Sequence, residues 1–328
     1  MAAASARRLI IVYDRKLLNK PYFVKWLKRF SYTLAVKGGE SFKDLANLPK
    51  LVGVILPMTA NISRHDCAIV AVGGGSIGDG AGFLASVIKR GIRLVHIPST
   101  WLAAVDSAHG GKTAMNVGKF KNQIGTFYSA RAVFFIKEML FGEPEKNLIS
   151  GFGEAQKMAL LTGGALYHKI NSAPVLNAKL LWSLLPELAR AKMHVVEMDL
   201  YENSGRRMIL NLGHTYGHAI ELCGGPRHLS HGEAVRIGLE FAMRFSEQKG
   251  LMSKRELNLA LAFLDKNPAT SRPKISKGEL LEAVANDKKA ASGGRVRFVF
   301  LKKPGRPITK EVRALEIYRF AKIIGWCK

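Results

Sequence analysis

Five short apolar runs rich in β-branched residues recur through the first half of the chain and limit the folds that it can adopt. The runs are RLIIVYD, SYTLAVK, DCAIVAVGGG, IRLVHIPST and RAVFFIK. Longer segments separate them. Such alternation is typical of βαβ units, in which parallel strands form a sheet that helices cover on its faces. The first half therefore predicts a Rossmann-like α/β domain.

The pattern changes near residue 149. Apolar residues then recur at helical spacing in LLWSLLPELARAKMHVVEMDL, GEAVRIGLEFAMRFSEQKG and KGELLEAVANDKKA, and strand-like runs are scarce until GGRVRFVFLKK near the end. We expect residues 1–148 to form the α/β domain with its parallel sheet, and residues 149–328 to form an all-helical domain. A cleft between two domains is a common place for an active site.

The chain is strongly basic, with a formal net charge of +25 over 328 residues. Such a charge raises the hypothesis of nucleic-acid binding. The basic residues are scattered, however, and the sequence has no run of five like charges. A basic surface that favours small anionic substrates is therefore the preferred interpretation, without a specific nucleic-acid partner.

The cysteines and the N-terminal segment indicate where in the cell the protein is located. Cys67, Cys223 and Cys327 are too few and too far apart for a disulfide framework or a thiolate zinc site. The N-terminal MAAASARRLIIVY has too short an apolar run for a signal peptide, and no segment is long enough to cross a membrane. We expect a cytoplasmic protein that does not bind a membrane.

A glycine turn follows the third apolar run, in CAIVAVGGGSIGDGAGF. Gly73, Gly74 and Gly75 lie between the predicted strand and a predicted helix. Successive glycines let backbone amides approach a ligand closely, and a helix N-terminus suits a pyrophosphate. The usual G-x-G-x-x-G fingerprint is not clearly present. A variant dinucleotide-binding turn is favoured over a turn that is merely tight.

A polar, glycine-rich segment, DSAHGGKTAMNVGKFKNQIGTFY, follows the fourth run. Lys112, Lys121 and Asn122 lie in its glycine-flanked loops, where lysine ammonium groups can act as point charges on phosphate. Its length and its place after a strand favour a binding loop over an ordinary connection.

Four of the nine histidines lie between residues 209 and 242. By itself this segment is compatible with a metal site, a proton relay or a surface without function. His214 and His218 are four residues apart and share one face of a predicted helix, while His231 begins another helix. Imidazoles around a divalent metal usually have a carboxylate companion, and Glu154 in the apolar stretch SGFGEAQKMALL is the best candidate. A metal site is favoured, with His228 as a rival to His231.

Many motifs in one order resemble the 3-dehydroquinate synthase family of sugar-phosphate cyclases. They are GGESFKD, GGGSIGD, RGIRLVHIPST, VDSAHGGKT, FKNQIGTFY, GFGEAQK, LNLGHTYGHAIE, SHGEAV and NDKKAASGG. The resemblance implies an NAD-binding N-terminal domain, a helical C-terminal domain, a divalent metal, usually zinc with cobalt as an option, and a homodimer. It also implies a lyase of the shikimate pathway, which makes aromatic amino acids.

The implied reaction converts 3-deoxy-D-arabino-heptulosonate 7-phosphate to 3-dehydroquinate and phosphate. It proceeds through transient oxidation by NAD, phosphate elimination, re-reduction and aldol ring closure, so that NAD acts without net redox change. A metal would polarise the hydroxyl that is oxidised. Most of the remaining contribution of the protein would be positioning.

The resemblance also implies roles for individual residues. It places the metal ligands at Glu154, His214 and His231, and assigns His218 to the substrate phosphate. NAD contacts fall on Asp14, Glu40, Lys43, Gly75, Ser76, Gly78, Asp79, Ser99, Thr100, Lys112 and Lys121. Substrate and catalytic positions fall on Asp106, Lys112, Asn122, Lys157, Lys192, Arg207, Asn211 and Lys288 or Lys289. Arg90 corresponds to an arginine that reaches the phosphate in the partner subunit's site.

The chain departs from the family pattern at several positions. It is some tens of residues shorter, mostly before the glycine turn, and Gly142 stands where a threonine usually contacts NAD. DLYENSGRR has one extra residue, so that Arg206 and Arg207 are both candidates for the substrate carboxylate. His109 has no assigned role.

Three rival functions stay open. They are another cyclase that acts on a heptulose 7-phosphate, a metal-dependent polyol dehydrogenase and an inactive nucleic-acid-binding protein. Asn211 and the arginines, which suit a substrate carboxylate, favour 3-dehydroquinate synthase.

Overall fold

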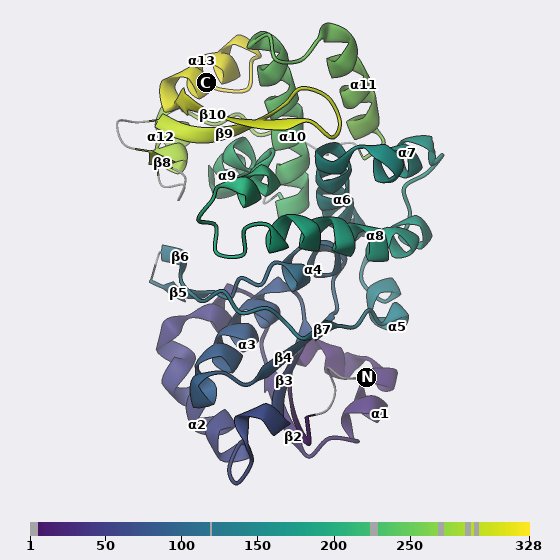
Figure 1. Cartoon of the computed structure of the whole chain (residues 1–328), viewed down its shortest axis with the longest axis vertical. Helices are drawn as coiled ribbons and strands as arrows, with labels where there is room; N and C mark the ends of the chain where they lie inside the picture. Colours follow the sequence, from purple (N-terminus) through teal and green to yellow (C-terminus); the bar gives the residue numbers. More distant parts are fainter. Residues whose placement is uncertain (1–5, 119, 224–228, 268–271, 286–289, 292–294) are drawn as a thin grey trace. The chain divides into compact units, whose positions relative to one another are not determined.

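A computed structural model describes the chain except for residues 1–5, 119, 224–228, 268–271, 286–289 and 292–294. The chain divides into two compact units, Met1–Pro144 and Glu145–Lys328, drawn in purple to blue and in teal to yellow in Figure 1. Each unit is described by itself. Among the described residues, no helix combines the length and the apolar character that crossing a bilayer requires.

A five-stranded parallel sheet forms the centre of the N-terminal unit, in the order β2-β1-β3-β4-β7. Its strands are β1 (Arg8–Asp14), β2 (Tyr32–Val36), β3 (Cys67–Gly73), β4 (Arg93–Pro98) and β7 (Ala132–Val133). Each strand lies within one of the five apolar runs, and β3 is buried along its whole length. The predicted parallel sheet is therefore confirmed.

Helices connect these strands. The α-helices are α1 (Pro21–Leu27), α2 (Leu48–Met58), α3 (Gly75–Val87), α4 (Trp101–Val105) and α5 (Lys137–Phe141). The 3₁₀ turns are η2 (Arg15–Asn19), η3 (Glu40–Lys43), η4 (Leu45–Asn47), η5 (Arg64–Asp66), η6 (Ile88–Arg90) and η7 (Ser107–His109). An antiparallel hairpin of β5 (Met115–Val117) and β6 (Phe120–Ile124) follows α4 and η7.

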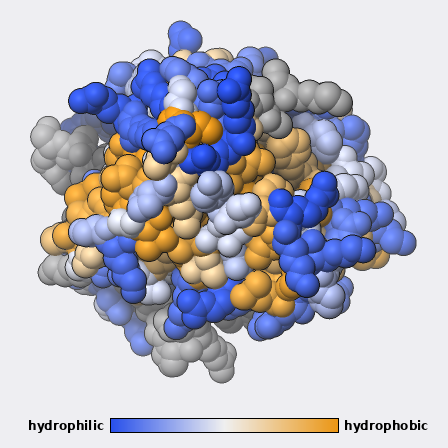
Figure 2. All heavy atoms as spheres, turned by 90° about the horizontal axis from the view of Figure 1, so that it is seen from below, coloured by the Kyte–Doolittle hydropathy of each residue, from blue (hydrophilic) through white to orange (hydrophobic). Residues whose placement is uncertain are grey.

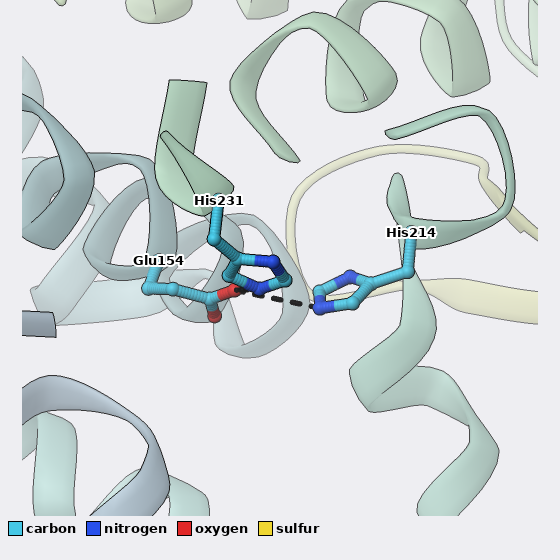
Figure 3. Close-up of side chains that lie close together, drawn as sticks. All are labelled: Glu154, His214 and His231. Atoms are coloured by element: carbon cyan, nitrogen blue, oxygen red, sulfur yellow. Dashed lines mark ion pairs between the residues drawn. The ribbon is translucent and has the colours of Figure 1, made fainter. Parts of the chain in front are cut away.

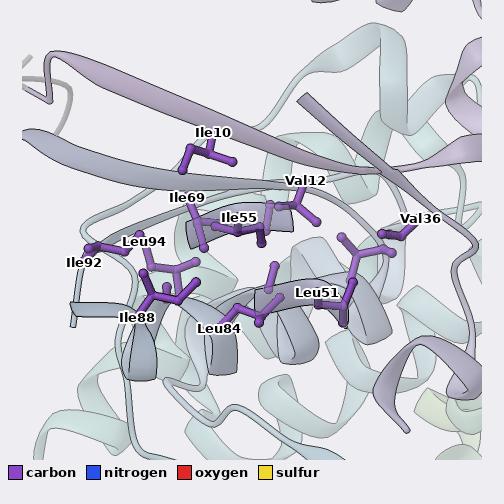
Figure 4. Packing of buried hydrophobic residues seen from close by; sticks show 14 of the residues in the cluster. Ile10, Val12, Val36, Leu51, Ile55, Ile69, Leu84, Ile88, Ile92 and Leu94 are labelled. Carbon is purple, nitrogen blue, oxygen red and sulfur yellow. The ribbon is translucent and has the colours of Figure 1, made fainter. Parts of the chain in front are cut away.

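Successive residues of the central strands pack on opposite faces of the sheet, as the two-residue period of a strand requires. On one face, Ile10 and Val12 of β1 pack in a cluster that includes Ile55 of α2 and Leu84 of α3 (Figure 4). On the other face, Ile11 lies in a second cluster, which includes Phe23, Val70 and Val72. Both faces are therefore apolar cores, and the polar groups of the sheet region gather at the strand ends.

The C-terminal unit is mainly helical. Its helices are α6 (Leu148–Thr162), α7 (Gly164–Ser172), α8 (Ala178–Glu197), α9 (His214–Cys223), α10 (His231–Gln248), α11 (Lys254–Asp265), α12 (Lys277–Ala285) and α13 (Ala314–Ile323), with 3₁₀ turns η8 (Glu145–Asn147) and η9 (Arg206–Asn211). A small sheet of order β10-β9-β8 accompanies them, formed by β8 (Ala290–Ala291), β9 (Arg295–Leu301) and β10 (Pro307–Arg313).

This small sheet is the one departure from the expected all-helical domain. The run RVRFVFL forms β9, whose last four residues are buried, and β10 pairs with it along its whole length. Phe298 and Phe300 of β9 pack against Phe245 of α10. Aromatic and β-branched residues favour a strand when one face is covered, and α10 provides that cover.

Exposed apolar side chains occur in both units, among them Leu56, Phe120 and Ile323. Figure 2 shows one face of the molecule, on which hydrophobic residues lie between hydrophilic ones. Scattered apolar exposure of this kind is normal for a folded surface.

Glycines allow α6 and α10 to approach until their backbones touch. A Cβ atom added to Gly153 would overlap the carbonyl oxygen of Gly232, and one added to Gly232 would overlap backbone atoms of Ser150. The Ser150 hydroxyl also accepts a hydrogen bond from the Gly232 amide, at 3.0 Å. Glu154 follows Gly153 and His231 precedes Gly232, so this contact brings two polar side chains together.

We predict that Gly232→Ala lowers the thermal stability of the protein, because a methyl group at this position has no space unless α6 and α10 separate. Overpacking of this kind typically costs about 1–3 kcal/mol. Thermal unfolding monitored by circular dichroism measures the effect. Gly278→Ala is the matched control, since nothing lies within 4 Å of an added Cβ in α12. Equal unfolding temperatures for the two variants would contradict the prediction.

Candidate metal centre and nucleotide-binding turn

The carboxylate of Glu154 is the centre of a polar cluster inside the C-terminal unit. Glu154 lies on α6 with no exposed surface, in a helix that is buried almost all round. Its Oε1 atom lies 3.4 Å from Nε2 of His214 and 3.4 Å from Nε2 of His231. Figure 3 shows both imidazole rings directed toward this oxygen.

Both histidines stand at the first residue of a helix. His214 begins α9 after Gly213, whose φ of 80° lies in the left-handed region that glycine adopts readily. His231 begins α10 after Ser230, which forms a capping box with Glu233. These helix starts, of which the sequence predicted the one at His231, fix where the two side chains project.

The cluster fits a divalent cation. The ligand atoms of Glu154, His214 and His231 all lie within 4.8 Å of one another. Neither buried oxygen of Glu154 has a hydrogen-bond partner of regular geometry among the described residues, although the ammonium of Lys157 forms an ion pair with Oε2. One carboxylate and two imidazoles are a donor set of catalytic zinc sites, in which one position stays open.

The electrostatics of the cluster favour ligands in the form that a metal needs. Burial, aided by the charge of Lys157, lowers the pKa of His214 to about 4, which leaves its imidazole neutral at pH 7. Burial alone would raise the pKa of Glu154, but the ammonium of Lys157 and the neighbouring histidines hold it well below its usual range. The carboxylate is therefore ionised.

His231, the third candidate ligand, carries a proton when no metal is bound. Burial lowers the pKa of His231, but the neighbouring carboxylates of Glu154 and Glu221 outweigh it and raise this pKa to about 10. Since a coordinating imidazole must be neutral at the ligating nitrogen, metal binding would displace this proton.

Glu221 of α9 is a member of the cluster that the sequence prediction omitted. Its Oε2 atom accepts a hydrogen bond from Nδ1 of His231 at 3.0 Å. The Nδ1 atom of His214 lies 3.2 Å from the backbone carbonyl of Leu212. Metal-binding histidines usually donate their second nitrogen to such oxygens, which orients the ring. Residues seven apart share a helix face, so HTYGHAIE places Glu221 on the same face as His214, but its contact with His231 depends on how α9 and α10 pack.

We predict that Glu221→Gln weakens zinc binding by about 10- to 100-fold, as loss of an orienting carboxylate usually does. Competition with a chromophoric chelator measures the affinity. His231→Ala should abolish zinc binding, and Glu247→Gln at the far end of α10 should leave it unchanged. Retention of zinc by His231→Ala would show that the ligand set is wrong, whereas an unchanged affinity in Glu221→Gln alone would reject only the orienting role.

Other predicted substrate residues of this unit lie near the cluster. The ring of His218 is 5.1 Å from that of His214 and 5.8 Å from that of His231. Lys157 is 2% exposed and contacts Glu154 directly. The structure therefore brings His218 and Lys157 to the three candidate ligands.

Two further elements, α8 and η9, pack against α6. They carry Lys192, which is buried, and Arg207 and Asn211. Arg207 is 3% exposed, and its Nε lies 3.3 Å from Oε1 of Glu202. Arg206 is exposed. Lys288, Lys289 and His228 lie outside the described residues.

In the N-terminal unit, the glycine turn joins β3 to α3. Gly74 is the N-cap of α3 and provides no side-chain cap. An added Cβ at Gly74 would lie 3.2 Å from Thr100, and one at Gly75 would lie 3.3 Å from the Ser107 hydroxyl. The Ser99 amide donates to the Gly73 carbonyl at 2.9 Å. The turn and the Ser99–Thr100 pair therefore lie together at the carboxyl ends of β3 and β4, where parallel sheets bind nucleotides.

A small pocket opens at this turn. It is lined by residues of β3, α3, β4 and the segment after α4, among them Gly73, Gly74, Gly78, Asp79, His96, Ser107 and Lys112. Burial lowers the pKa of His96 to about 4, so that it adds no positive charge. Lys112 therefore lies beside the glycine turn, which is where a residue that contacts NAD is expected. Asp106 lies at the C-cap of α4.

The remaining predicted NAD residues lie on neighbouring turns. Asp14 ends β1, and an added Cβ at Gly38 would overlap its carboxylate. The Gly39 amide donates to Ser76 Oγ of α3 at 2.9 Å, next to Glu40. This contact joins the loop after β2 to the first turn of α3.

Lys43 links these elements to the hairpin. It is 2% exposed, and its ammonium lies 2.7 Å from Oδ2 of Asp79 and 2.5 Å from Oδ1 of Asn122. Burial raises the pKa of Asp79, and the Lys43 ammonium opposes this shift. Lys121 lies on the exposed strand β6.

Arg90 lies in a 3₁₀ turn, η6, that follows the end of α3 at Val87. Lys89 and Arg90 both have positive φ, of 51° and 61°. Such backbone is uncommon outside glycine. The ammonium of Lys89 donates to the carbonyls of Thr59 and Ile62, which fixes this turn, while the Arg90 side chain is exposed.

Comparisons with known proteins cover both units. The model of the 3-dehydroquinate synthase N-terminal family matches residues 33–150, and that of the C-terminal family matches residues 151–290. The 3-dehydroquinate synthase of Prochlorococcus marinus (strain MIT 9215) is 36% identical over 315 residues, which are 94% of this chain and 82% of that protein. That of Leptospira interrogans serovar copenhageni is 38% identical over 280 residues, which are 84% of this chain and 76% of that protein.

Solved structures share the fold over nearly the whole chain. A 2-deoxy-scyllo-inosose synthase complexed with carbaglucose-6-phosphate, NAD+ and Co2+ superposes with a TM-score of 0.85 at 27% identity, covering 98% of this chain and 91% of that one. An iron-containing alcohol dehydrogenase from Thermotoga maritima shares only the fold, with a TM-score of 0.62 at 15% identity. The superposition covers 98% of this chain and 92% of that one.

The fold and the cluster of one carboxylate and two imidazoles fit the class of sugar-phosphate cyclases that bind NAD and a divalent metal. Family models for both halves match the chain, and its curated relatives are more than 30% identical over most of their length. The chain therefore belongs to the 3-dehydroquinate synthase family, and the resemblance read from its motifs is confirmed.

Proposed function

We propose that the protein catalyses the 3-dehydroquinate synthase reaction, which converts 3-deoxy-D-arabino-heptulosonate 7-phosphate to 3-dehydroquinate and phosphate in aromatic amino-acid biosynthesis. The cluster of Glu154, His214 and His231 carries the proposal, because it lies in a chain whose two halves both match the family. The cytoplasm is the proposed location, in keeping with the sparse cysteines.

We assign NAD to residues 1–148 and the metal and most substrate contacts to residues 149–328. The 2-deoxy-scyllo-inosose synthase complex contains NAD+ and Co2+, and the donor set of the cluster suits zinc or cobalt. When bound, NAD supplies reversible hydride acceptance and the metal polarises the hydroxyl that reacts.

The side chains of this chain then have separate tasks. Lys157 neutralises the buried carboxylate of Glu154 and keeps it ionised. His218, beside the ligand histidines, and Lys112, beside the glycine turn, are assigned to the substrate phosphate. Holding phosphate and ring carbons in one orientation removes much of the entropic barrier to elimination and ring closure.

The opposite end of the substrate needs groups that bind a carboxylate. Arg207 and Asn211 on η9 are the proposed pair, together with Lys192 of α8. A guanidinium can bind a carboxylate through two parallel hydrogen bonds. Of the two arginines left open by the sequence, we choose Arg207, because it is buried on a turn that packs against α6 whereas Arg206 is exposed.

Another sugar-phosphate cyclase activity is the second candidate, favoured by the superposition on 2-deoxy-scyllo-inosose synthase. The higher identity to curated 3-dehydroquinate synthases supports the first candidate. The polyol dehydrogenase hypothesis has support from the fold alone.

Phosphate release from the heptulosonate phosphate tests the function. We expect release that requires a divalent metal and only catalytic amounts of NAD, without accumulation of NADH, because the hydride leaves and returns within one turnover. Glucose 6-phosphate and sedoheptulose 7-phosphate are the comparison substrates. Faster release from either would support another cyclase, and stoichiometric NADH formation with glycerol would support a dehydrogenase.

We also propose that the protein is a homodimer in which Arg90 reaches the phosphate in the partner subunit's site. We predict that Arg90→Ala and Lys112→Ala are each inactive, and that a mixture of the two regains activity after subunit exchange. Recovery is expected because one site of each mixed dimer contains both wild-type residues. Exchange is followed by native mass spectrometry, and complete exchange without recovered activity would show that Arg90 does not serve the neighbouring site.

A further inference from the structure

The side chain of Asn116 on β5 joins two residues that are far apart in the sequence. It is 7% exposed. Its Nδ2 donates to Oε2 of Glu40 at 2.8 Å, and its Oδ1 accepts from the backbone amide of Asn122 at 2.9 Å. All three residues belong to the N-terminal unit, near the hairpin β5–β6 (Figure 1).

The backbone of Asn122 is in the left-handed region, with a φ of 55°. Asparagine adopts this conformation more often than most residues other than glycine. The hydrogen bond to Asn116 fixes its amide, and the ammonium of Lys43 fixes its side-chain oxygen at 2.5 Å. These contacts hold Asn122 although every residue of β6, Asn122 included, is exposed.

Asparagine is well suited to this position among side chains of its size. A backbone amide can only donate and an ionised carboxylate can only accept, so the bridging side chain must present one acceptor and one donor. Aspartate would keep the acceptor for Asn122 but place a second negative charge against Glu40. Leucine, of similar volume, would make neither contact.

The bridge connects residues with different proposed tasks. Glu40 and Lys43 of η3 are assigned to NAD, and Asn122 is assigned to the substrate. Lys43 gives a parallel connection, since it contacts both Asp79 and Asn122. A ligand that fixes η3 therefore also fixes the backbone and side chain of Asn122.

We propose that Asn116 is a positioning residue that couples the NAD contacts to the substrate contact, so that bound NAD increases the affinity for the sugar phosphate. The inference rests on the proposed function. Coupling between two binding sites is reciprocal, so substrate must tighten NAD binding by the same factor. Fixing Asn122 before the substrate arrives is the physical source of this factor.

Isothermal calorimetry on the metal-depleted protein tests the coupling without turnover. It measures the NAD dissociation constant with and without saturating heptulosonate phosphate. We expect the substrate to tighten NAD binding by about 5- to 100-fold in the wild type, the usual range for coupled sites. In Asn116→Asp and Asn116→Leu this factor should fall to near one.

Steady-state kinetics at saturating NAD measures the effect of both substitutions on the substrate. Asn116→Leu should raise KM for the substrate by about 10-fold, the loss of a well-placed hydrogen bond, with a smaller change in kcat. Asn116→Asp should also raise KM, by the coupling factor that it loses, and should bind NAD more weakly because its carboxylate repels that of Glu40. Asn258→Leu, at an exposed position of α11, is the control for the substitution itself.

The outcomes are distinct. Unchanged NAD affinity and unchanged coupling in Asn116→Asp would overturn the inference. If Asn116→Leu does not fold, the measurements on Asn116→Asp are sufficient for the test. The effect must act through Asn122, so Asn116→Leu should raise KM less when Asn122 is already alanine. A rise in KM that is equally large in the Asn122→Ala background would also overturn the inference. A wild-type protein that releases no phosphate from the substrate would instead reject the proposed function.

Discussion

A buried negative charge must be neutralised by its neighbours, and the carboxylate of Glu154 imposes this requirement on the C-terminal unit. An isolated carboxylate in a protein interior is strongly unfavourable. Here Lys157 and two imidazoles surround it. Removing one partner from such a group leaves an uncompensated charge. The first residues of α9 and α10 and the glycine contact between α6 and α10 are arranged around this one group.

The two units contain groups that suit ligands of opposite charge. At the glycine turn, the N-terminus of α3 has backbone amides without a side-chain cap, which suits an anion. In the C-terminal unit, carboxylate oxygens without regular hydrogen-bond partners suit a cation. A cofactor with a pyrophosphate and a divalent metal are the ligands that satisfy these two requirements.

Patterns that act locally could be predicted from the sequence. The five strands, the glycine turn and the helix start at His231 follow from periodicity and glycine placement, and the motif order identified the family. Contacts set by packing could not be predicted in the same way. Glu221 meets His231 only because α9 and α10 pack together, and Asn116 meets Glu40 only because a hairpin lies beside η3. The small sheet β8–β10 depends likewise on cover from α10.

The backbone contact between Gly153 and Gly232 has a consequence for metal selectivity. Because the two helices already touch, α6 and α10 cannot move closer together around a smaller ion. An ion that accepts four or five ligands can use one carboxylate, two imidazoles and a reacting oxygen. Mg²⁺, which requires an octahedron and prefers oxygen ligands, is poorly matched to this nitrogen-rich donor set. The helix contact and the donor set together would then discriminate among cellular cations.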